Sequence, residues 1–257
     1  FAEELMKNYS ILDDGRILFN VSAGFENYSQ RNNEFKWSHP KNPKLKMDAL
    51  SMCNVTSIVM ALDYLGWKFP EGDYKQPEDN LCNFIFRSSE VQRFYKEKMP
   101  VLYDAFERGD DDAYCPNLIH LVLAYATNQW LGANSAITFE ERAPISKIIK
   151  EVLFYKRPVI MSGTFPYKFL NGTEGTIGHI NVLVGLIYPK GTTAISPITK
   201  PEEFVFDDPY GNWKENFKAG TGNDTTFTYD EFIKYYKGCN DTRYKMAHFV
   251  KNGVALI

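Results

Sequence analysis

The sequence predicts an α+β fold in which a helical N-terminal half packs on an antiparallel β-sheet from the C-terminal half. Apolar residues recur at helical spacing between residues 53 and 155, whereas short β-branched runs divided by Gly and Pro clusters follow Arg157. Strands and helices do not alternate, so a parallel βαβ array is not expected. The length suits one domain over residues 1–257, with a helical insertion at about 84–135.

The N-terminal stretch, up to about Lys46, is rich in Asn, Ser, Lys and Pro, which is typical of extended chain and loops. A buried helix is then expected from about Cys53 to Leu65, because apolar residues return every three or four positions. Gly66 stands where a left-handed C-terminal cap is favoured. The apolar positions of this helix are Val55, Ile58, Val59, Leu62 and Leu65.

The same patterns predict the later elements. Three more helices are expected in the middle of the chain, at 89–107, 116–131 and 143–155, and Pro116 suits a first helical turn. Gly and Pro clusters then separate apolar runs of strand length. These runs predict strands at 158–161, 180–188, 204–206 and 248–257, with one further helix at 229–236.

Composition excludes several classes of function. The 29 basic and 32 acidic residues give a net charge of -3, so the sequence predicts no nucleic-acid partner. Its apolar runs are shorter than the roughly 18 residues of a membrane-spanning helix, so no membrane span is predicted. The sequence starts at Phe1 rather than Met, and targeting is left open.

Neither the cysteines nor the remaining histidines have the spacing of metal ligands, so the sequence predicts no metal site and no cofactor. The cysteines are Cys53, Cys82, Cys115 and Cys239, and the histidines treated as structural are His39, His120 and His248.

Cys53 is the candidate nucleophile. A cysteine attacks as the thiolate, and the N-terminus of a helix stabilises negative charge. Cys53 begins a helix so apolar that it must be central, which would present the thiol from the core into a cleft. The alternative is a buried structural cysteine without chemistry.

Two later segments contain residues that would complete a nucleophilic site. His179 begins an otherwise apolar strand after a glycine-rich loop, which suits a base that must approach the nucleophile and stay partly solvated. Asp207 and Asp208 end the strand at 204–206, and either carboxylate could fix the tautomer of the imidazole. The structural alternatives are a polar residue at a strand end for His179 and a common turn for the aspartates.

Five segments between residues 29 and 211 add a resemblance to this pattern. They are Ser29–Asn33, Met52–Leu62, Arg157–Ile160, Gly178-His179 and Asp208–Gly211. Together with the chain order cysteine, histidine, acid, they resemble the C39-like, papain-like cysteine peptidases, and above all the bacterial and bacteriophage members. The resemblance implies a papain-like fold whose central nucleophile helix packs on the C-terminal sheet.

The resemblance also implies roles for individual residues. Cys53 would be the nucleophile, His179 the general base and acid, and Asp208, directly before a proline, the residue that orients the histidine. Gln30 matches the glutamine whose side-chain amide forms an oxyanion hole with the Cys53 backbone N–H.

The spacing around Gln30 departs from the family pattern. The family glutamine lies much nearer the cysteine, whereas the segment from Asn32 to Met52 looks like an expanded loop. This puts Gln30 in doubt more than the other three residues, with Asn33 or Asp48 as weaker substitutes.

The implied function is a cysteine peptidase that cleaves amide bonds without a cofactor. The resemblance to bacterial and phage members implies a peptidoglycan endopeptidase, a cell-wall lysin that is virion-associated or extracellular. The alternatives are a non-catalytic structural or binding module of a larger virion or cell-wall assembly, and a papain-fold amidase or acyltransferase. Tyr210 and Trp213, after the acid-bearing strand, either line the substrate groove or cap the core.

Overall fold

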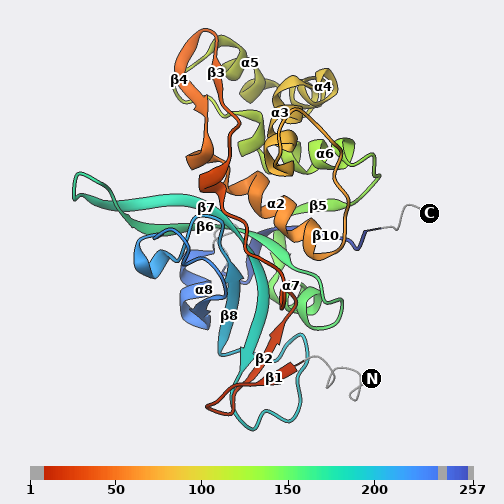
Figure 1. Cartoon of the computed structure of the whole chain (residues 1–257), viewed down its shortest axis with the longest axis vertical. Coiled ribbons are helices and arrows are strands. Elements are labelled where there is room, and N and C mark those ends of the chain that lie inside the picture. Colours follow the sequence, from red (N-terminus) through yellow and green to blue (C-terminus); the bar gives the residue numbers. More distant parts are fainter. Residues whose placement is uncertain (1–8, 237–241, 254–257) are drawn as a thin grey trace.

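The computed structural model describes residues 9–236 and 242–253 of the chain. Within these residues, an eight-stranded antiparallel sheet lies between two groups of helices (Figure 1). The predicted α+β fold is therefore confirmed. The strands of the sheet are β1 (Tyr9–Ile11), β2 (Ile17–Asn20), β5 (Ile137–Pro144), β6 (Val159–Lys168), β7 (Glu174–Tyr188), β8 (Glu203–Asp207), β9 (Thr225–Thr228) and β10 (Tyr244–Val250).

Strand β7 is the centre of this sheet, because it pairs with β6, β2 and β8. Its side chains alternate between the two faces, as in any strand that is buried on both sides. Val182 and Val184 belong to one hydrophobic core, whereas Leu183 between them belongs to the other. The outer halves of β6 and β7 continue beyond the sheet as a projecting hairpin (Figure 1).

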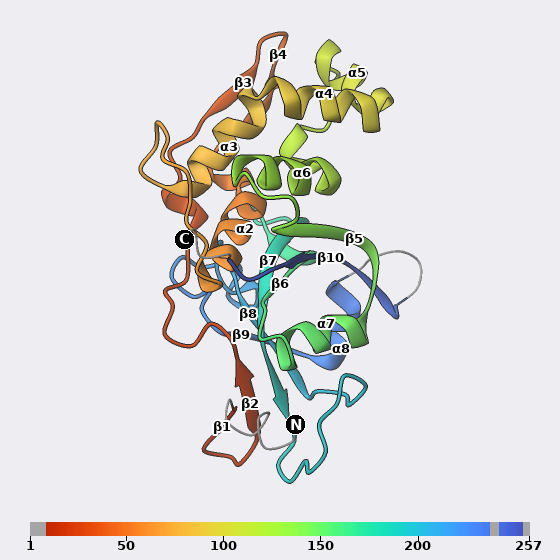
Figure 2. The same cartoon turned by 90° about the vertical axis from the view of Figure 1, so that its right-hand side faces the viewer.

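The helices divide between the two faces of the sheet (Figure 2). One core contains α2 (Cys53–Tyr64), which lies against β7 and β6. The other contains α7 (Ile145–Leu153) and α8 (Tyr229–Tyr235). Further from the sheet, the α2 side carries α3 (Pro77–Arg87), α4 (Ser89–Lys98), α5 (Pro100–Arg108), α6 (His120–Trp130) and a separate hairpin of β3 (Trp37–His39) and β4 (Asn42–Met47).

The N-terminal stretch, expected to be extended chain and loops, contains four short strands, which were not predicted individually. These strands are 3–6 residues long, and most of their Asn, Ser and Lys residues are exposed or half-buried. Their composition is therefore that of a loop. β1 pairs with β2 and β3 pairs with β4 as local hairpins, and only the pairing of β2 with β7 joins segments far apart in the sequence.

The helical block also differs from the prediction. The helix expected at 89–107 is broken at Met99, because a residue before proline is disfavoured in the helical conformation. The helix expected at 143–155 begins only after β5 ends at Pro144, and α3 was not predicted. The final strand, predicted at 248–257, overlaps β10 only at its end, because β10 begins at Tyr244 and stops at Val250. Residues 254–257 and Cys239 lie outside the described residues.

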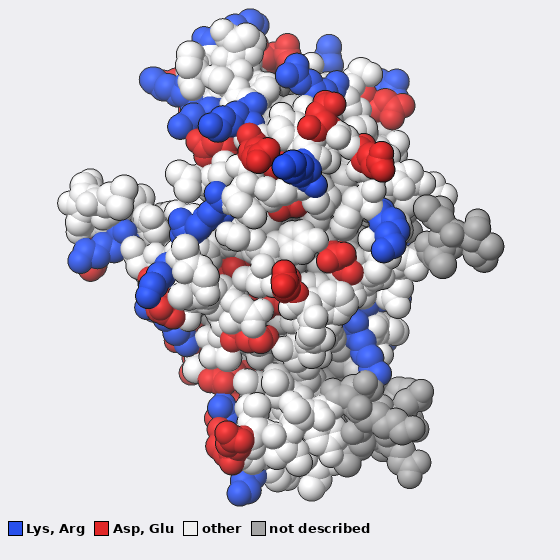
Figure 3. Space-filling view, viewed as in Figure 1, with Lys and Arg blue, Asp and Glu red and all other residues white. Residues whose placement is uncertain are grey.

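In the described part of the chain, none of the helices combines the length and the apolar character needed to cross a membrane. Basic and acidic side chains are interspersed over the face seen in Figure 3, and Lys and Arg gather at its upper end, over β3 and β4. The helical insertion expected at about 84–135 stays a prediction.

Candidate active site

Cys53 is the first residue of α2 and is half-exposed. Ten of the twelve residues of this helix are buried, so α2 runs through the core and presents its N-terminal end at the surface. The unsatisfied N–H groups of that end give it a partial positive charge, which attracts negatively charged groups. The predicted position of Cys53 at the start of a central helix is therefore observed.

A hydrogen bond between α2 and β7 sets the position of Cys53 relative to His179. The Ser57 hydroxyl donates to the carbonyl oxygen of Ile180 at 3.0 Å, and Ile180 directly follows His179. Ser57 lies one turn after Cys53 and therefore on the same face of the helix. This bond, together with the packing of α2 on β7, holds the helix end near the histidine, and no feature of the sequence indicated the bond.

His179 and Asp208 form a buried pair. His179 Nε2 lies 2.7 Å from Asp208 Oδ1, and the two side chains are each 3% exposed. Ionised Asp208 accepts hydrogen bonds only, so Nε2 carries the hydrogen and Nδ1 is the nitrogen left for Cys53. The structure thus brings together the three residues that the sequence singled out.

The protonation of His179 is governed by opposing effects. Burial of the ring disfavours the imidazolium, whereas the charge and hydrogen bond of Asp208 favour it, with further help from the Cys53 side chain. The favourable effects prevail and raise the pKa of His179 to about 10. The site therefore favours a protonated imidazole beside the thiol at neutral pH.

Asp208 is held by the turn that follows β8. Its Oδ1 accepts the backbone N–H groups of Tyr210 at 2.8 Å and Gly211 at 3.2 Å, besides the histidine. Aspartate commonly makes such bonds in turns, so the turn interpretation and the functional interpretation of Asp208 apply together. The backbone N–H of Asp208 donates to the carbonyl oxygen of Gly222 at 2.8 Å, which fixes the turn from its other side.

Asp207, the alternative partner of the histidine, makes different contacts. It accepts the hydroxyl of Tyr64 at 2.7 Å and the backbone N–H of Asp224 at 3.0 Å. Burial raises its pKa. Adjacent residues in an extended segment point to opposite sides, which is why only Asp208 reaches His179.

Three aromatic rings surround the imidazole. Their centroids lie 5.2 Å (Phe217), 6.1 Å (Phe165) and 6.1 Å (Tyr210) from that of His179. Phe217 adopts φ 58°, which is unfavourable for a residue with a side chain. The guanidinium of Arg31 donates to the carbonyl oxygens of Tyr210 and Phe217 and so secures this segment. Neither Phe217 nor Arg31 was assigned to the site from the sequence.

Gln30 is buried beside the site, but its amide is engaged. Its Nε2 donates to the carbonyl oxygens of Ala49 at 3.0 Å and Leu50 at 3.1 Å, within the short 3-10 helix Ala49–Ser51. Its backbone N–H donates to Pro209 at 2.9 Å. Gln30 therefore ties the segment before Cys53 to the turn of Asp208, a contact that the sequence did not reveal. Its contribution to an oxyanion hole stays a prediction.

The two substitutes for Gln30 are also engaged. The amide of Asn33 donates to the hydroxyl of Thr56 at 3.0 Å, inside the protein. Asp48 caps the 3-10 helix by accepting the N–H of Leu50 at 3.1 Å. A carboxylate has no hydrogen to offer an oxyanion, so Asp48 is the poorer substitute.

The two predicted substrate-binding aromatics lie in different places. Tyr210 is half-buried near His179, and the Arg31 guanidinium lies 4.0 Å from its ring centroid. Trp213 stacks on Phe227 at 5.7 Å and contacts Tyr235 at 4.7 Å, so it packs on the core under α8. Its packing agrees with the alternative of a core cap, whereas Tyr210 stays a candidate for contact with substrate.

The other three histidines make contacts of their own, and His39 packs against Trp37 and Phe106. His120 Nδ1 lies 2.8 Å from His248 Nε2 inside the protein, and burial lowers the pKa of His120 to about 4 and that of His248 as well. Among the described residues, no cluster of three or more His, Cys, Asp or Glu side chains could hold a metal ion.

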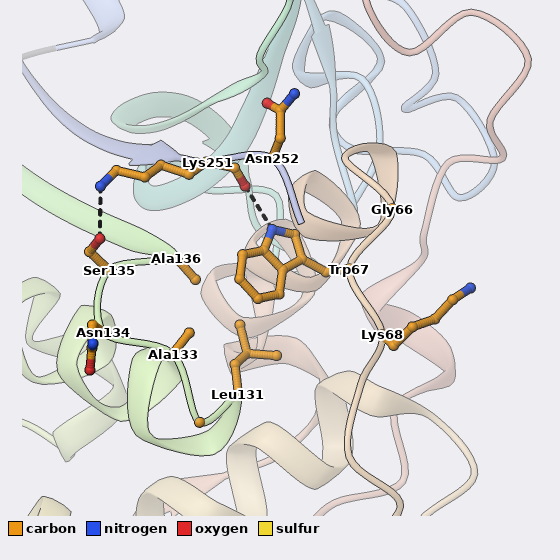
Figure 4. Close-up of a pocket in the computed structure, with 11 residues that line it drawn as sticks. Gly66, Trp67, Lys68, Leu131, Ala133, Asn134, Ser135, Ala136, Lys251 and Asn252 are labelled. Atoms are coloured by element: carbon orange, nitrogen blue, oxygen red, sulfur yellow. Dashed lines mark hydrogen bonds between the residues drawn. The ribbon is translucent and has the colours of Figure 1, made fainter. Parts of the chain in front are cut away.

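A cavity of about 660 Å³ lies at the other end of α2 (Figure 4). Trp67, Leu131 and Lys251 are among its lining residues, and the Trp67 indole donates to the carbonyl oxygen of Lys251 at 2.7 Å. A helix of twelve residues is about 18 Å long, so this cavity is separate from the candidate site at Cys53.

An α+β fold with a cysteine at the start of a buried helix and a histidine–aspartate pair on the adjoining sheet is the arrangement of papain-like cysteine peptidases. The model of the Peptidase C39 like family matches residues 23–241, and the chain belongs to this family. Comparison with curated proteins gave no match. Membership of the family indicates a cysteine peptidase, that is, a hydrolase.

Proposed function

We propose that Cys53, His179 and Asp208 form the catalytic triad of a peptidase that cleaves amide bonds. The observation that supports this most is the buried 2.7 Å hydrogen bond between His179 and Asp208, next to the helix end that carries Cys53. An ion pair buried in an apolar surrounding costs desolvation energy, and a catalytic role explains its presence.

In the proposed mechanism, the Cys53 thiolate attacks the carbonyl carbon of the scissile bond and forms a C–S bond. As the tetrahedral intermediate collapses, the C–N bond breaks, and the leaving amine takes the proton from His179 Nδ1. Water then attacks the thioester and gives its proton to the same nitrogen, and the acid product leaves as the thiolate is released. Asp208 stays ionised throughout and holds Nε2.

The oxyanion is held by the backbone N–H of Cys53, one of the N–H groups at a helix start that lack an intrahelical acceptor. Gln30 joins this site when its amide releases one of the carbonyl oxygens of Ala49 and Leu50. Such a donor typically contributes about 10²–10³ in rate.

The substrate we propose is a peptide bond of bacterial peptidoglycan, on the strength of the segments that resemble bacterial and phage members. The test compares hydrolysis of peptidoglycan and casein by the wild type and Cys53→Ala, with products identified by mass spectrometry. If the wild type cleaves peptidoglycan and Cys53→Ala does not, the proposal is supported. Cleavage of casein alone keeps the peptidase and rejects the substrate.

Alkylation by iodoacetamide at pH 7 separates the peptidase from a non-catalytic module. Burial raises the pKa of Cys82 and that of Cys115, so these two thiols are matched internal controls. Peptide mapping should find label on Cys53 well before either control. If Cys53 reacts as slowly as they do and neither substrate is cut, the chain is a binding module.

A further inference from the structure

A second layer of buried polar groups lies behind the histidine–aspartate pair. Asn181 Nδ2 donates to Asp208 Oδ2 at 3.1 Å, the oxygen that the histidine does not use. The hydroxyl of Tyr236 donates to Asn181 Oδ1 at 2.8 Å. Asn181 and Tyr236 are both 0% exposed, so water does not compete for these bonds.

The direction of both hydrogen bonds that link Asp208, Asn181 and Tyr236 follows from the charge of Asp208. An ionised carboxylate only accepts, so Asn181 must present its NH₂ to Asp208 and its oxygen to Tyr236. Tyr236 must then be the donor and must stay protonated. Burial raises the pKa of Tyr236 well above its ordinary value, which agrees with this requirement.

Asn181 and Tyr236 are also held in place by the elements that carry them. Asn181 lies on β7 two residues after His179, so both side chains leave the same face of the strand. The ring of Tyr236 stacks on Phe206 with centroids 4.6 Å apart and planes 8° apart. Neither Asn181 nor Tyr236 can turn away without leaving a buried polar group unpaired.

We infer that Asn181 and Tyr236 are positioning residues, which hold the Asp208 carboxylate oriented toward His179. This inference rests on the proposed function of Cys53, His179 and Asp208. In metal sites, groups that orient a ligand residue through a hydrogen bond typically contribute about 10- to 100-fold to affinity or activity, and we expect an effect of similar size here. Without the Asn181 amide, the imidazolium is less well stabilised, and a smaller fraction of Cys53 is thiolate at acidic pH.

The test measures the rate of Cys53 alkylation between pH 4 and 9 for the wild type, Asn181→Leu, Tyr236→Phe and a matched control, Tyr188→Phe. Tyr188 is also 0% exposed, but its hydroxyl has no hydrogen-bond partner among the described residues. In Asn181→Leu, the pH of half-maximal alkylation should rise by about one unit. Tyr236→Phe should give a smaller rise, and Tyr188→Phe none.

On the substrate that the wild type cuts, Asn181→Leu should lower kcat about 10- to 100-fold with KM unchanged. A purely structural role would lower the melting temperature of Asn181→Leu and Tyr236→Phe without moving the pH of half-maximal alkylation, and that result overturns the inference. Tyr236→Phe removes only the hydroxyl oxygen, so its pH of half-maximal alkylation tests the inference if Asn181→Leu does not fold. Slow alkylation of Cys53 in the wild type would instead overturn the proposed function.

Discussion

Asp208→Asn is the substitution that most directly tests the buried ion pair. It keeps the size of the side chain and an oxygen for the N–H groups of Tyr210 and Gly211, and it removes the charge. Breaking a buried ion pair by removal of one partner costs about 3–5 kcal/mol. We expect the free energy of unfolding at pH 6 to fall by about 3 kcal/mol, because Asn retains part of the hydrogen bonding.

The pH dependence follows from the sign of the pKa change. In the wild type, the pKa of His179 rises from 6.5 to about 10 on folding, so the pair stabilises fully below pH 6.5 and loses this contribution as pH rises to about 10. In Asp208→Asn combined with Cys53→Ala, burial alone acts and lowers the pKa of His179, so the variant loses stability as pH falls below 6.5. The difference between the two proteins should therefore be largest near pH 6 and small above pH 10.

The assay is urea unfolding followed by tryptophan fluorescence at pH 6, 8 and 10. Running both proteins in a Cys53→Ala background removes the titration of the thiol. Asp207→Asn is the control, since it removes a neighbouring buried carboxylate that lies away from His179. An Asp208→Asn effect that stays constant from pH 6 to pH 10 would refute the charged pair and leave only a neutral hydrogen bond.

Three further predictions test contacts around the site and away from it. Gly222→Ala places a Cβ 1.9 Å from the carbonyl oxygen of Asp208, so it should displace the turn, slow alkylation of Cys53 at least tenfold and lower the melting temperature. Gln30→Glu sets a carboxylate against two carbonyl oxygens and should cost about 1–3 kcal/mol in urea unfolding, whereas an unchanged midpoint would show that these bonds contribute nothing. Because burial lowers the pKa of His120, the protein should lose stability as pH falls from 6.5 through about 4. His120→Phe should flatten this pH dependence in thermal unfolding at pH 4–7. An unchanged pH dependence would show that His248 alone causes it.

The parts of the fold that the sequence predicted best are those in which local pattern and burial agree. The apolar periodicity after Cys53 gave α2 to within one residue of its C-terminal end, and the β-branched run after His179 gave the inner half of β7. The outer half of β7, from Glu174, was missed because its residues are mostly exposed and it pairs only with β6. Hydrophobic periodicity reveals only elements that bury one face, and most residues of this hairpin are exposed.

The residues of the candidate site likewise fall into those that the sequence could predict and those that it could not. Cys53 and Asp208 could be singled out because each stands where an apolar element begins or ends. His179 could be singled out because the apolar part of β7 follows it, although β7 itself begins at Glu174 rather than at His179 as expected. Asn181 and Tyr236 could not, because an asparagine within an apolar strand and an aromatic residue after a helix are common, and their bond depends on how β7 and α8 come together. Contacts that only tertiary packing creates leave no local signal in the sequence.

The turn at Asp208 shows why an acid could be predicted here while the choice between Asp207 and Asp208 stayed open. The Asp-Pro-x-Gly turn fixes Oδ1 against two backbone N–H groups, and this geometry is present whether or not a histidine is near. The pairing of β7 with β8 sets Val182 opposite Asp207, which carries the next residue, Asp208, past the end of the strand to His179. The same oxygen thus serves the turn and the imidazole. Under the proposed function, folding and chemistry therefore depend on the same oxygen, so a substitution at Asp208 should affect both stability and activity.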